Sequence, residues 1–377
     1  MRIVSVVGTR PQLIKAAALS PVLRAHHDEI LVDTGQHYDD SLAGSFFREL
    51  GLAAPDHALG VGGGSHAEQT AAMLSALEPV LIDRRPDMVL VYGDTNSTLA
   101  GALAAAKLGL PVAHVEAGLR SFDRGMPEEI NRIVADHLSR WLFVPTPTAV
   151  DNLKAEGITD GVVLVGDLMQ DLAARVGREV VGRAALREVG ERLADAAPGL
   201  DLRPGSYLFA TIHRAENREA GAIRAWSELL NRIATPDRPI ILALHPGTRW
   251  AIERDGIVLA PDVRLVEPQG YRTSLTLQMH AAAVLTDSGG VQREAAWLGV
   301  PCLVLRATTE WVEAVASSGG RMVVVGLDAD RSVEALARLA PPGSSPDLAR
   351  DRAAAFDLAP AGAAEAIVAA LPSPSRR

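Results

Sequence analysis

Residues 87–146 read DMVLVYGDTNSTLAGALAAAKLGLPVAHVEAGLRSFDRGMPEEINRIVADHLSRWLFVPT. Three apolar runs in this stretch have the length and composition of fully buried strands: 88–92, 111–115 and 142–144. Segments with helical spacing separate these runs, and the steady alternation predicts a doubly wound parallel sheet. An acidic residue follows closely after each of the first two runs, Asp94 and Glu116 respectively.

The acidic residues of this stretch are predicted to meet at one edge of the sheet. Parallel strands end at the same edge, so Asp94 and Glu116 are expected to lie close together. Glu128, Glu129 and Arg132 then begin the next helix. Glu128 and Arg132 share a helix face at i,i+4, and an exposed salt bridge is therefore the alternative interpretation. Carboxylates that arrive from consecutive elements favour a reaction site with proton transfer.

The same alternation extends to both sides of this stretch. An apolar run at 3–7 and a helix from Pro11 begin the chain, and a second alternating unit starts at Tyr207. Residues 172–204 lose the strand pattern and are interpreted as helix and linker. A chain of 377 residues, 48% of them apolar, is expected to form two α/β domains.

The composition narrows the function classes. The formal net charge is −9 and the pI is about 5.6, so no general nucleic-acid surface is expected. The single cysteine, Cys302, lies in the apolar run 301–305 and is interpreted as a buried small hydrophobe rather than a nucleophile. No apolar run approaches about 20 residues and no leader is recognised, so we expect a cytoplasmic protein without membrane contact.

Two strand-to-helix junctions are candidate phosphate sites. Arg10 lies where the run 3–7 meets a helix, and helix N-termini attract anions through their N–H groups and the helix dipole. A solvated surface arginine is the alternative. In the second half, the run 283–286 meets Ser288-Gly289-Gly290 at the start of a helix, a geometry that cradles phosphate on backbone N–H groups. The dinucleotide fingerprint G-x-G-x-x-G is absent after the first strand.

A series of motifs in this order resembles a known family: Gly8-Thr-Arg-Pro11, Gly35-Gln-His37, Gly93-Asp-Thr95, His114-Val-Glu-Ala-Gly-Leu-Arg120, Pro127-Glu-Glu-Ile-Asn-Arg132, His213-Arg-Ala-Glu-Asn217, His245-Pro246 and Thr286-Asp-Ser-Gly-Gly-Val-Gln-Arg-Glu294. Together they are similar to the non-hydrolysing UDP-N-acetylglucosamine 2-epimerases over about residues 3 to 330.

This resemblance implies the GT-B fold, with two Rossmann-like domains facing each other across a cleft. The expected domains are 1–170, with a C-terminal helix at about 355–372 packing back on it, and the UDP-binding domain 171–354. It also implies a homodimer that needs no cofactor and no metal. The expected reaction interconverts UDP-GlcNAc and UDP-ManNAc.

The chemistry of that reaction fits the residues. The hydrogen on C2 of an intact sugar ring is not acidic, because no carbonyl is adjacent. Departure of UDP from C1 would acidify it and give a 2-acetamidoglucal, to which UDP re-adds after the proton returns on the opposite face. This route needs groups that stabilise the leaving diphosphate, carboxylates that transfer the proton, and exclusion of water.

The resemblance also assigns site residues. The catalytic positions are Asp94, Glu116, Glu128 and His213, and the carboxylate that serves each face of the sugar stays open. The positions expected to bind the UDP-sugar are Arg10, Lys15, Arg132, Tyr271, Ser288, Gly289, Gly290 and Glu294. Among these, Arg10 and Arg132 are expected at the diphosphate with His213, Glu294 at the ribose and Tyr271 near uracil. A salt bridge within its own helix is the alternative for Lys15.

Two departures from the family pattern leave the substrate and the regulation open. Gln36 and His37 are followed by Tyr38-Asp39 instead of the usual residues, and the arginine of the family's activating second site falls near Gly63. Allosteric activation by UDP-GlcNAc is therefore an open question. The segments 120–126 and 309–313 are more similar to the branch that acts on UDP-2,3-diacetamido-glucuronate. The substituents at C3 and C6 of the sugar are therefore open as well.

Three other functions compete with this interpretation. A hydrolysing 2-epimerase would release ManNAc and UDP. A GT-B glycosyltransferase would use the same fold and phosphate turn, but would not need the carboxylates around one sugar. A catalytically silent UDP-sugar sensor would be expected to lose Asp94, Glu116 or His213, and all three are present.

Overall fold

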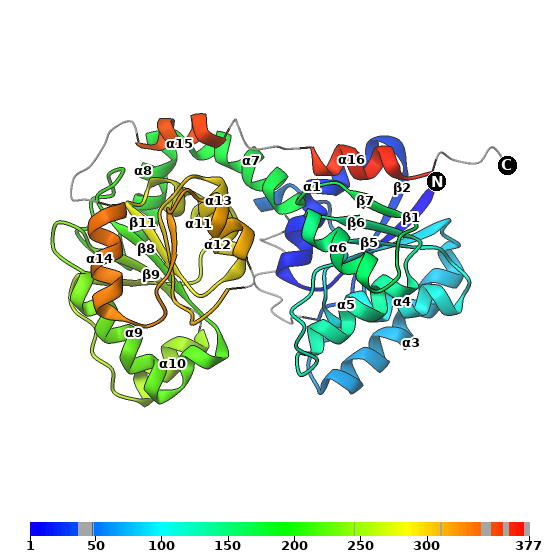
Figure 1. The fold of residues 1–377 in the computed structure, drawn as a ribbon, viewed down its shortest axis with the longest axis horizontal. Helices are drawn as coiled ribbons and strands as arrows, with labels where there is room; N and C mark the ends of the chain where they lie inside the picture. Colours follow the sequence, from blue (N-terminus) through cyan, green and yellow to red (C-terminus); the bar gives the residue numbers. More distant parts are fainter. Residues whose placement is uncertain are drawn as a thin grey trace. The chain divides into compact units, whose positions relative to one another are not determined.

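The computed structural model describes residues 1–36, 47, 49–244, 246–309, 311–340, 348–356 and 362–372. The expectations about His37, Tyr38, Asp39, His245 and residue 310 lie outside the described residues. The chain divides into two compact units, Met1–Leu172 with Pro360–Arg377, and Ala173–Ala359. Each unit is built around its own parallel sheet (Figure 1).

The sheet of the first unit has 7 strands in the order β3-β2-β1-β4-β5-β6-β7. The strand bounds are β1 Arg2–Val7, β2 Asp28–Asp33, β3 His57–Ala58, β4 Met88–Tyr92, β5 Val112–Val115, β6 Trp141–Val144 and β7 Val162–Leu164. Each neighbouring pair is parallel. The strands β4 and β5 are buried along their whole length, as expected for strands covered on both faces.

The order of the strands reverses between β1 and β4. β1 leads to β2 on one side, whereas β4 leads to β5 on the other. Open α/β sheets bind ligands beyond the carboxyl ends of their strands at such a point. The loops that follow β1 and β4 lead to Arg10 and Asp94, so the topology places both beside the reversal.

The helices of the first unit cover both faces of its sheet. Their bounds are α1 Arg10–His26, α3 His66–Arg84, α4 Asn96–Lys107, α5 Pro127–Leu138, α6 Pro147–Ala155 and α16 Ala363–Ala370, while α7 Leu168–Val180 leads into the second unit. In Figure 1, α3, α4 and α5 lie together on one face, and α1 and α16 lie on the other. A Cβ on Gly101 of α4 would meet Val91 Cγ1 at 2.9 Å, so α4 packs directly on β4.

Asp171 attaches the last helix to the first unit. Its Oδ1 accepts a hydrogen bond from Gly362 N at 2.8 Å, and its Oδ2 accepts one from Ala364 N at 2.9 Å. A carboxylate in this position satisfies N–H groups at the start of α16 and complements the helix dipole. Burial raises the pKa of Asp171, although these backbone hydrogen bonds oppose the shift.

The second unit repeats the same architecture. Its sheet has 6 strands in the order β10-β9-β8-β11-β12-β13, with every neighbouring pair parallel. The strand bounds are β8 Leu208–Ile212, β9 Ile240–Leu244, β10 Val263–Val266, β11 Ala283–Thr286, β12 Cys302–Val304 and β13 Met322–Val324. The order reverses between β8 and β11, and the loops after these two strands carry His213 and Ser288.

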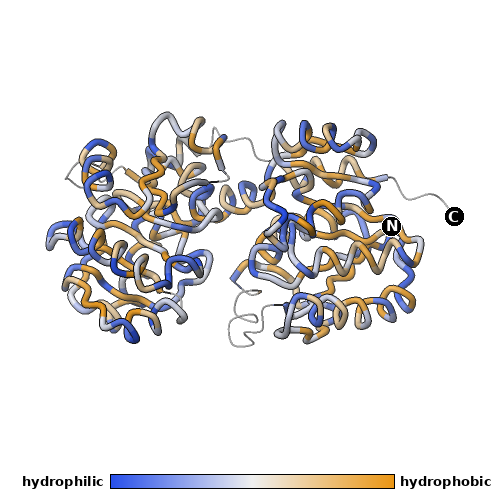
Figure 2. Tube along the Cα trace, turned by 60° about the horizontal axis from the view of Figure 1, so that its bottom comes forward, coloured by the Kyte–Doolittle hydropathy of each residue, from blue (hydrophilic) through white to orange (hydrophobic). Residues whose placement is uncertain are grey.

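The helices of the second unit surround a core that includes the fully buried Trp226. Their bounds are α8 Arg183–Leu193, α9 Ala220–Ile233, α10 Pro246–Arg254, α11 Tyr271–His280, α12 Gly289–Trp297, α13 Val312–Ser317, α14 Ala329–Leu339 and α15 Leu348–Phe356, with a short 3₁₀ helix, η1, at Ala215–Arg218. Figure 2 shows hydrophobic segments in the interior of each unit and hydrophilic segments on its outer helices and loops.

The structure confirms the predicted doubly wound parallel sheets and the interpretation of Cys302. That residue lies in β12 and is fully buried, and burial raises the pKa of its thiol to about 12. A thiol in this state is inert rather than nucleophilic. Among the described residues, no helix combines the length and the apolar character needed to cross a membrane.

The role of Asp171 can be tested by Asp171→Ala. The variant removes the acceptor for two N–H groups at the start of α16, which should destabilise that helix by about 1–2 kcal/mol. Amide hydrogen exchange in residues 362–371 is therefore expected to become about 5- to 30-fold faster. Asp160→Ala, which changes an exposed aspartate of the same unit, is the control. Equal exchange in the two variants would show that Asp171 does not hold α16.

Candidate active site

The loop after β1 begins the candidate site of the first unit. Gly8 passes close to two side chains, and a Cβ there would meet Thr34 Oγ1 at 2.0 Å, so only glycine fits. Arg10 is the first residue of α1 and is exposed. Gln12 ties this helix to the neighbouring strand, because its Nε2 donates to Tyr92 O at 2.7 Å. The start of α1 is thereby fixed beside the end of β4.

Lys15 and Glu116 form a buried ion pair between α1 and the end of β5. The two side chains are 6% and 12% exposed. Lys15 therefore pairs with a distant carboxylate, and the alternative of a salt bridge within its own helix is wrong. Gly93, with φ of 62°, leaves room for this lysine, since a Cβ there would lie 3.1 Å from Lys15 Nζ.

The backbone of Glu116 is itself unusual. Its φ is 68°, in the left-handed region that residues with a side chain rarely adopt. Glu116 N and Ala117 N both donate to Phe143 O, at 3.0 and 3.1 Å, and this bifurcated contact holds the turn. Strained backbone of this kind persists only where the surroundings impose it, and it clusters at functional sites.

Arg132 of α5 pairs with Asp94 after β4. Its NH2 group lies 2.5 Å from Asp94 Oδ2, and its NH1 group lies 3.0 Å from Glu129 Oε2. Burial opposes the charge on Arg132, but the two carboxylates outweigh it and raise the pKa of its guanidinium. Asn131 Nδ2 also donates to Asp94 O at 2.9 Å. Both the side chain and the backbone of Asp94 are thus held by α5.

The partner of Arg132 on its own helix is Glu129 rather than Glu128. The expected alternative of an exposed Glu128–Arg132 bridge at i,i+4 is therefore wrong, and the observed pair is i,i+3. Glu129 is buried, whereas Glu128 is half-buried at the start of the same helix. Asp94 with Arg132 and Glu116 with Lys15 thus form two ion pairs that follow the neighbouring strands β4 and β5 at the carboxyl edge of the sheet.

Glu129 organises the loop 121–126, a role that sequence reasoning missed. Its carboxylate accepts hydrogen bonds from Ser121 N at 2.9 Å, Ser121 Oγ at 3.0 Å and Phe122 N at 3.0 Å. Burial would raise the pKa of Glu129, but these hydrogen bonds and Arg132 lower it. Phe122 adopts a φ of 59° and is 78% exposed. A serine eight residues before a helix-opening glutamate is too weak a signal to predict this contact.

In the second unit, Asp287 arranges the loop that carries His213. The backbone N–H groups of His213 and Arg214 donate to its carboxylate at 3.0–3.2 Å, and Asn217 Nδ2 donates at 2.8 Å. His213 Nδ1 lies 3.4 Å from Asp287 Oδ1, and the histidine side chain is 45% exposed. Asp287 itself is fully buried, so it serves as an anchor for the exposed imidazole.

The Ser-Gly-Gly turn has the predicted geometry. Ser288 is the N-cap of α12, its Oγ accepts from Val291 N at 3.4 Å, and Gly289 and Gly290 form the first turn. Glu294 is buried one turn further on, where Gln278 Nε2 donates to its Oε2 at 2.6 Å. Tyr271 begins α11 and is 2% exposed. This edge of the second sheet can bind an anion at a helix N-terminus.

The part played by Glu129 can be tested with a matched pair of variants. Glu129→Gln leaves one acceptor oxygen for four donors, so the loop 121–126 should open more often. Losing such contacts costs about 1–3 kcal/mol, and tryptic cleavage after the exposed Arg124 should accelerate about tenfold or more. Glu128→Gln removes the same charge one residue earlier and should leave the cleavage rate unchanged. A similar rate in both variants would contradict the assignment.

Comparisons with known proteins identify the family of the chain. A family model described as UDP-N-acetylglucosamine 2-epimerase matches residues 22–371. A UDP-N-acetylglucosamine 2-epimerase homolog of Methanococcus maripaludis is 44% identical over 345 residues, which make up 90% of this chain and 93% of that protein. The UDP-2,3-diacetamido-2,3-dideoxy-D-glucuronate 2-epimerase of Pseudomonas aeruginosa is 45% identical over 341 residues, 89% of this chain and 91% of that one.

A solved structure extends the comparison to the fold. The crystal structure of Methanocaldococcus jannaschii UDP-GlcNAc 2-epimerase in complex with UDP-GlcNAc and UDP matches with a TM-score of 0.78 at 36% identity. The match covers 93% of this chain and 98% of that chain. Since the family model spans most of the chain and these relatives and this structure match it over about nine-tenths of its length, the chain has the GT-B fold and belongs to the UDP-N-acetylglucosamine 2-epimerase family.

Proposed function

We propose that the chain interconverts UDP-GlcNAc and UDP-ManNAc by elimination and re-addition of UDP. The observation that carries this proposal is the pair of carboxylate–cation contacts at one sheet edge, Lys15–Glu116 and Arg132–Asp94. Proton transfer at an unactivated carbon needs carboxylates in fixed positions, and the leaving diphosphate needs cations. Family membership supplies the substrate class.

The reaction is balanced without an oxidant. The C1–O bond breaks and its electron pair leaves with UDP, while the proton on C2 passes to a carboxylate base. The product is 2-acetamidoglucal with a double bond between C1 and C2. A proton then returns to C2 from the opposite face as UDP oxygen re-forms the bond to C1, which inverts the configuration at C2 alone.

The chain's own residues divide this work. Asp94, Glu116 and Glu128 are the candidates for the two proton transfers. Arg10, Arg132 and His213 are candidates for charge stabilisation at the departing diphosphate, and the α12 N-terminus at residues 288–290 adds backbone N–H groups. Glu294 is the candidate for the ribose hydroxyls and Tyr271 for the face of uracil. No resident cofactor or metal enters the scheme, and the proposal includes a homodimer in the cytoplasm.

A second substrate stays within the proposal. The relative that acts on UDP-2,3-diacetamido-2,3-dideoxy-D-glucuronate is 45% identical to this chain. The loop 121–126 carries the exposed Phe122. It is the candidate for contacting the substituents at C3 and C6 of the sugar. The elimination chemistry is the same for both sugars, because neither substituent takes part in breaking the C1–O or C2–H bond.

The reaction itself can be tested in D₂O. Purified protein incubated with UDP-GlcNAc should give UDP-ManNAc, with deuterium at C2 in both sugars. NMR measures this incorporation. Release of free ManNAc would make the chain a hydrolysing epimerase instead. If UDP-GlcNAc does not react, the diacetamido-glucuronate sugar nucleotide is tested in the same way. Absence of C2 exchange with both substrates would contradict the proposal.

The part of Asp94 can be tested by Asp94→Asn. The amide cannot accept a proton at the working pH, so the rate of C2 exchange should fall by about 10²–10⁴-fold. Binding of UDP, measured by calorimetry, should stay nearly unchanged. Asp151→Asn, which removes the same charge from an exposed position of α6, is the control and should keep full exchange. Unchanged exchange in Asp94→Asn would remove this residue from the mechanism.

A further inference from the structure

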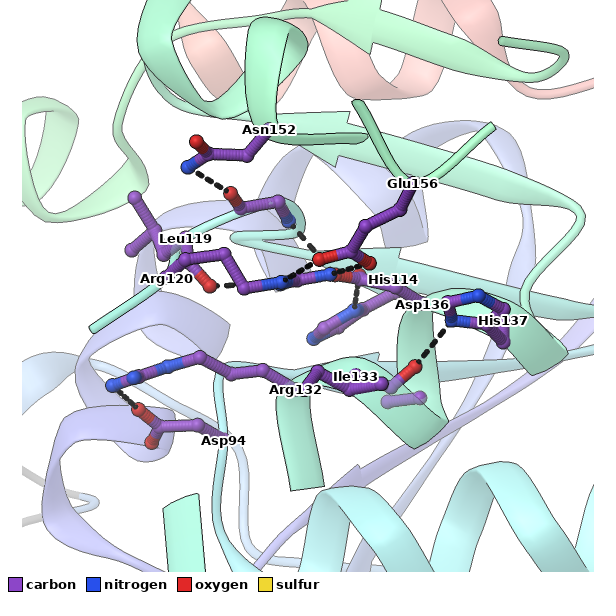
Figure 3. A network of polar contacts seen from close by, with 12 residues as sticks. Asp94, His114, Leu119, Arg120, Arg132, Ile133, Asp136, His137, Asn152 and Glu156 are labelled. Atoms are coloured by element: carbon purple, nitrogen blue, oxygen red, sulfur yellow. Dashed lines mark hydrogen bonds and ion pairs between the residues drawn. The ribbon is translucent and has the colours of Figure 1, made fainter. Parts of the chain in front are cut away.

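A buried ionic network lies behind the candidate site of the first unit (Figure 3). It consists of His114 on β5, Asp136 on α5, Arg120 in the following loop and Glu156 at the end of α6. His114 Nδ1 lies 2.6 Å from Asp136 Oδ1, and Arg120 NH1 lies 2.7 Å from Asp136 Oδ2. Arg120 also binds both oxygens of Glu156, at 2.7 and 2.8 Å.

Two hydrogen bonds hold the imidazole ring of His114. Its Nε2 lies 2.7 Å from Gly93 O, and a carbonyl oxygen only accepts, so Nε2 carries a proton. Its Nδ1 faces Asp136. Burial would raise the pKa of Asp136, but His114 and Arg120 outweigh burial and lower it. The two ring nitrogens of His114 thus contact two different elements, the end of β4 and the helix α5.

The network pairs basic with acidic side chains. His114 and Arg120 face Asp136, and Arg120 also faces Glu156. The side chains of His114 and Asp136 are fully buried, and that of Arg120 is 1% exposed. Burying charges is costly unless they are paired and hydrogen-bonded, so the set is stable as a whole and sensitive to the loss of a member. None of the three is accessible enough to touch a substrate.

Hydrogen bonds to backbone groups connect the network to the segments that carry the candidate catalytic residues. The carbonyl that accepts from His114 belongs to Gly93, the residue directly before Asp94. Asp136 Oδ2 also accepts from Gly118 N at 3.1 Å, two residues after Glu116. Asp136 lies one turn beyond Arg132 on α5, and Figure 3 shows Arg132 reaching Asp94 from that helix. The contact between His114 and Asp136 thus connects three segments: the loop after β4 with Asp94, the turn after β5 with Glu116, and α5.

We propose that His114, held by Asp136, is a positioning residue that sets the place of Asp94 relative to Glu116 through its hydrogen bond to the Gly93 carbonyl. The inference rests on the proposed function for its catalytic readout. The physical reason is that Asp94 follows a left-handed glycine, with φ of 62°, and a loop of this kind needs an external tie to hold one geometry. A displacement of about 1 Å at a proton-transfer group can lower the rate by about 10²-fold.

Two neutral variants of His114 separate positioning from charge and packing. His114→Gln places an amide N–H near the position of Nε2 and can keep the bond to Gly93 O. His114→Asn places its amide near Nδ1 and can keep only the contact with Asp136. Both replace the same buried imidazole with a neutral amide, so their losses of stability should be similar, as checked by thermal unfolding.

The expected result is a difference in kcat between the two variants. His114→Gln should stay within about threefold of the unmodified chain, while His114→Asn should lose about 10²-fold in kcat with little change in KM. Equal losses in both, or no loss in either, would overturn the proposal. If His114→Asn does not fold, Asp136→Asn, which keeps the side-chain volume but releases His114 from its charged anchor, replaces it with the same expected loss.

A control and a second readout complete the test. Glu156→Gln weakens the outer end of the network away from Gly93, so it should lower stability without lowering kcat. A 10²-fold loss of kcat in Glu156→Gln would show that the network has only a general structural role. Amide exchange at residues 94–96 should be faster in His114→Asn than in His114→Gln. That readout needs no turnover, so it tests the positioning role even if the unmodified chain fails to epimerise either sugar nucleotide.

Discussion

The buried ion pair between Lys15 and Glu116 is the constraint on which the first unit's site depends. Removing one partner of a buried pair costs about 3–5 kcal/mol, far more than the loss of a pair at the surface. Lys15 comes from the helix after β1 and Glu116 from the turn after β5, with β4 between these strands. The order of these strands brings the two residues to one edge, and a residue with a side chain before Asp94 would crowd Lys15 Nζ. Glycine at position 93 avoids this contact.

Three acidic residues of the first unit share a second property, because each is held by a cation or by backbone donors from another element. Arg132 holds Asp94, Lys15 holds Glu116, and the loop amides with Arg132 hold Glu129. Behind them, His114 and Asp136 link the turns themselves. Such preorganisation restricts motion of the groups that transfer protons, which is the arrangement that acid–base catalysis on an unactivated carbon requires.

The sequence predicted the sheets because buried parallel strands are continuous apolar runs, and it predicted that Asp94 and Glu116 follow strands that end at the same edge. It did not predict the partner of Arg132, because the i,i+4 rule describes an isolated helix, whereas Asp94 lies 38 residues away. The roles of Asp136 and Asp287 were missed for the same reason. Their partners lie 22 and 70 residues distant, at His114 and Asn217, and only the folded sheet brings them together. Local sequence patterns predict strands and turns, whereas the pairing of side chains from different elements depends on the tertiary structure.

The proposed mechanism requires that the bond between C1 and the diphosphate oxygen breaks during epimerisation, while the carboxylates of the first unit move the C2 proton. The most direct measurement uses UDP-GlcNAc labelled with ¹⁸O at the oxygen that bridges C1 and the β-phosphorus, in D₂O, analysed by ³¹P and ¹H NMR. We expect ¹⁸O to move into non-bridging positions of the β-phosphate as deuterium enters C2. Deuterium at C2 with all of the ¹⁸O retained in the bridge would contradict cleavage of the bond between C1 and the diphosphate oxygen.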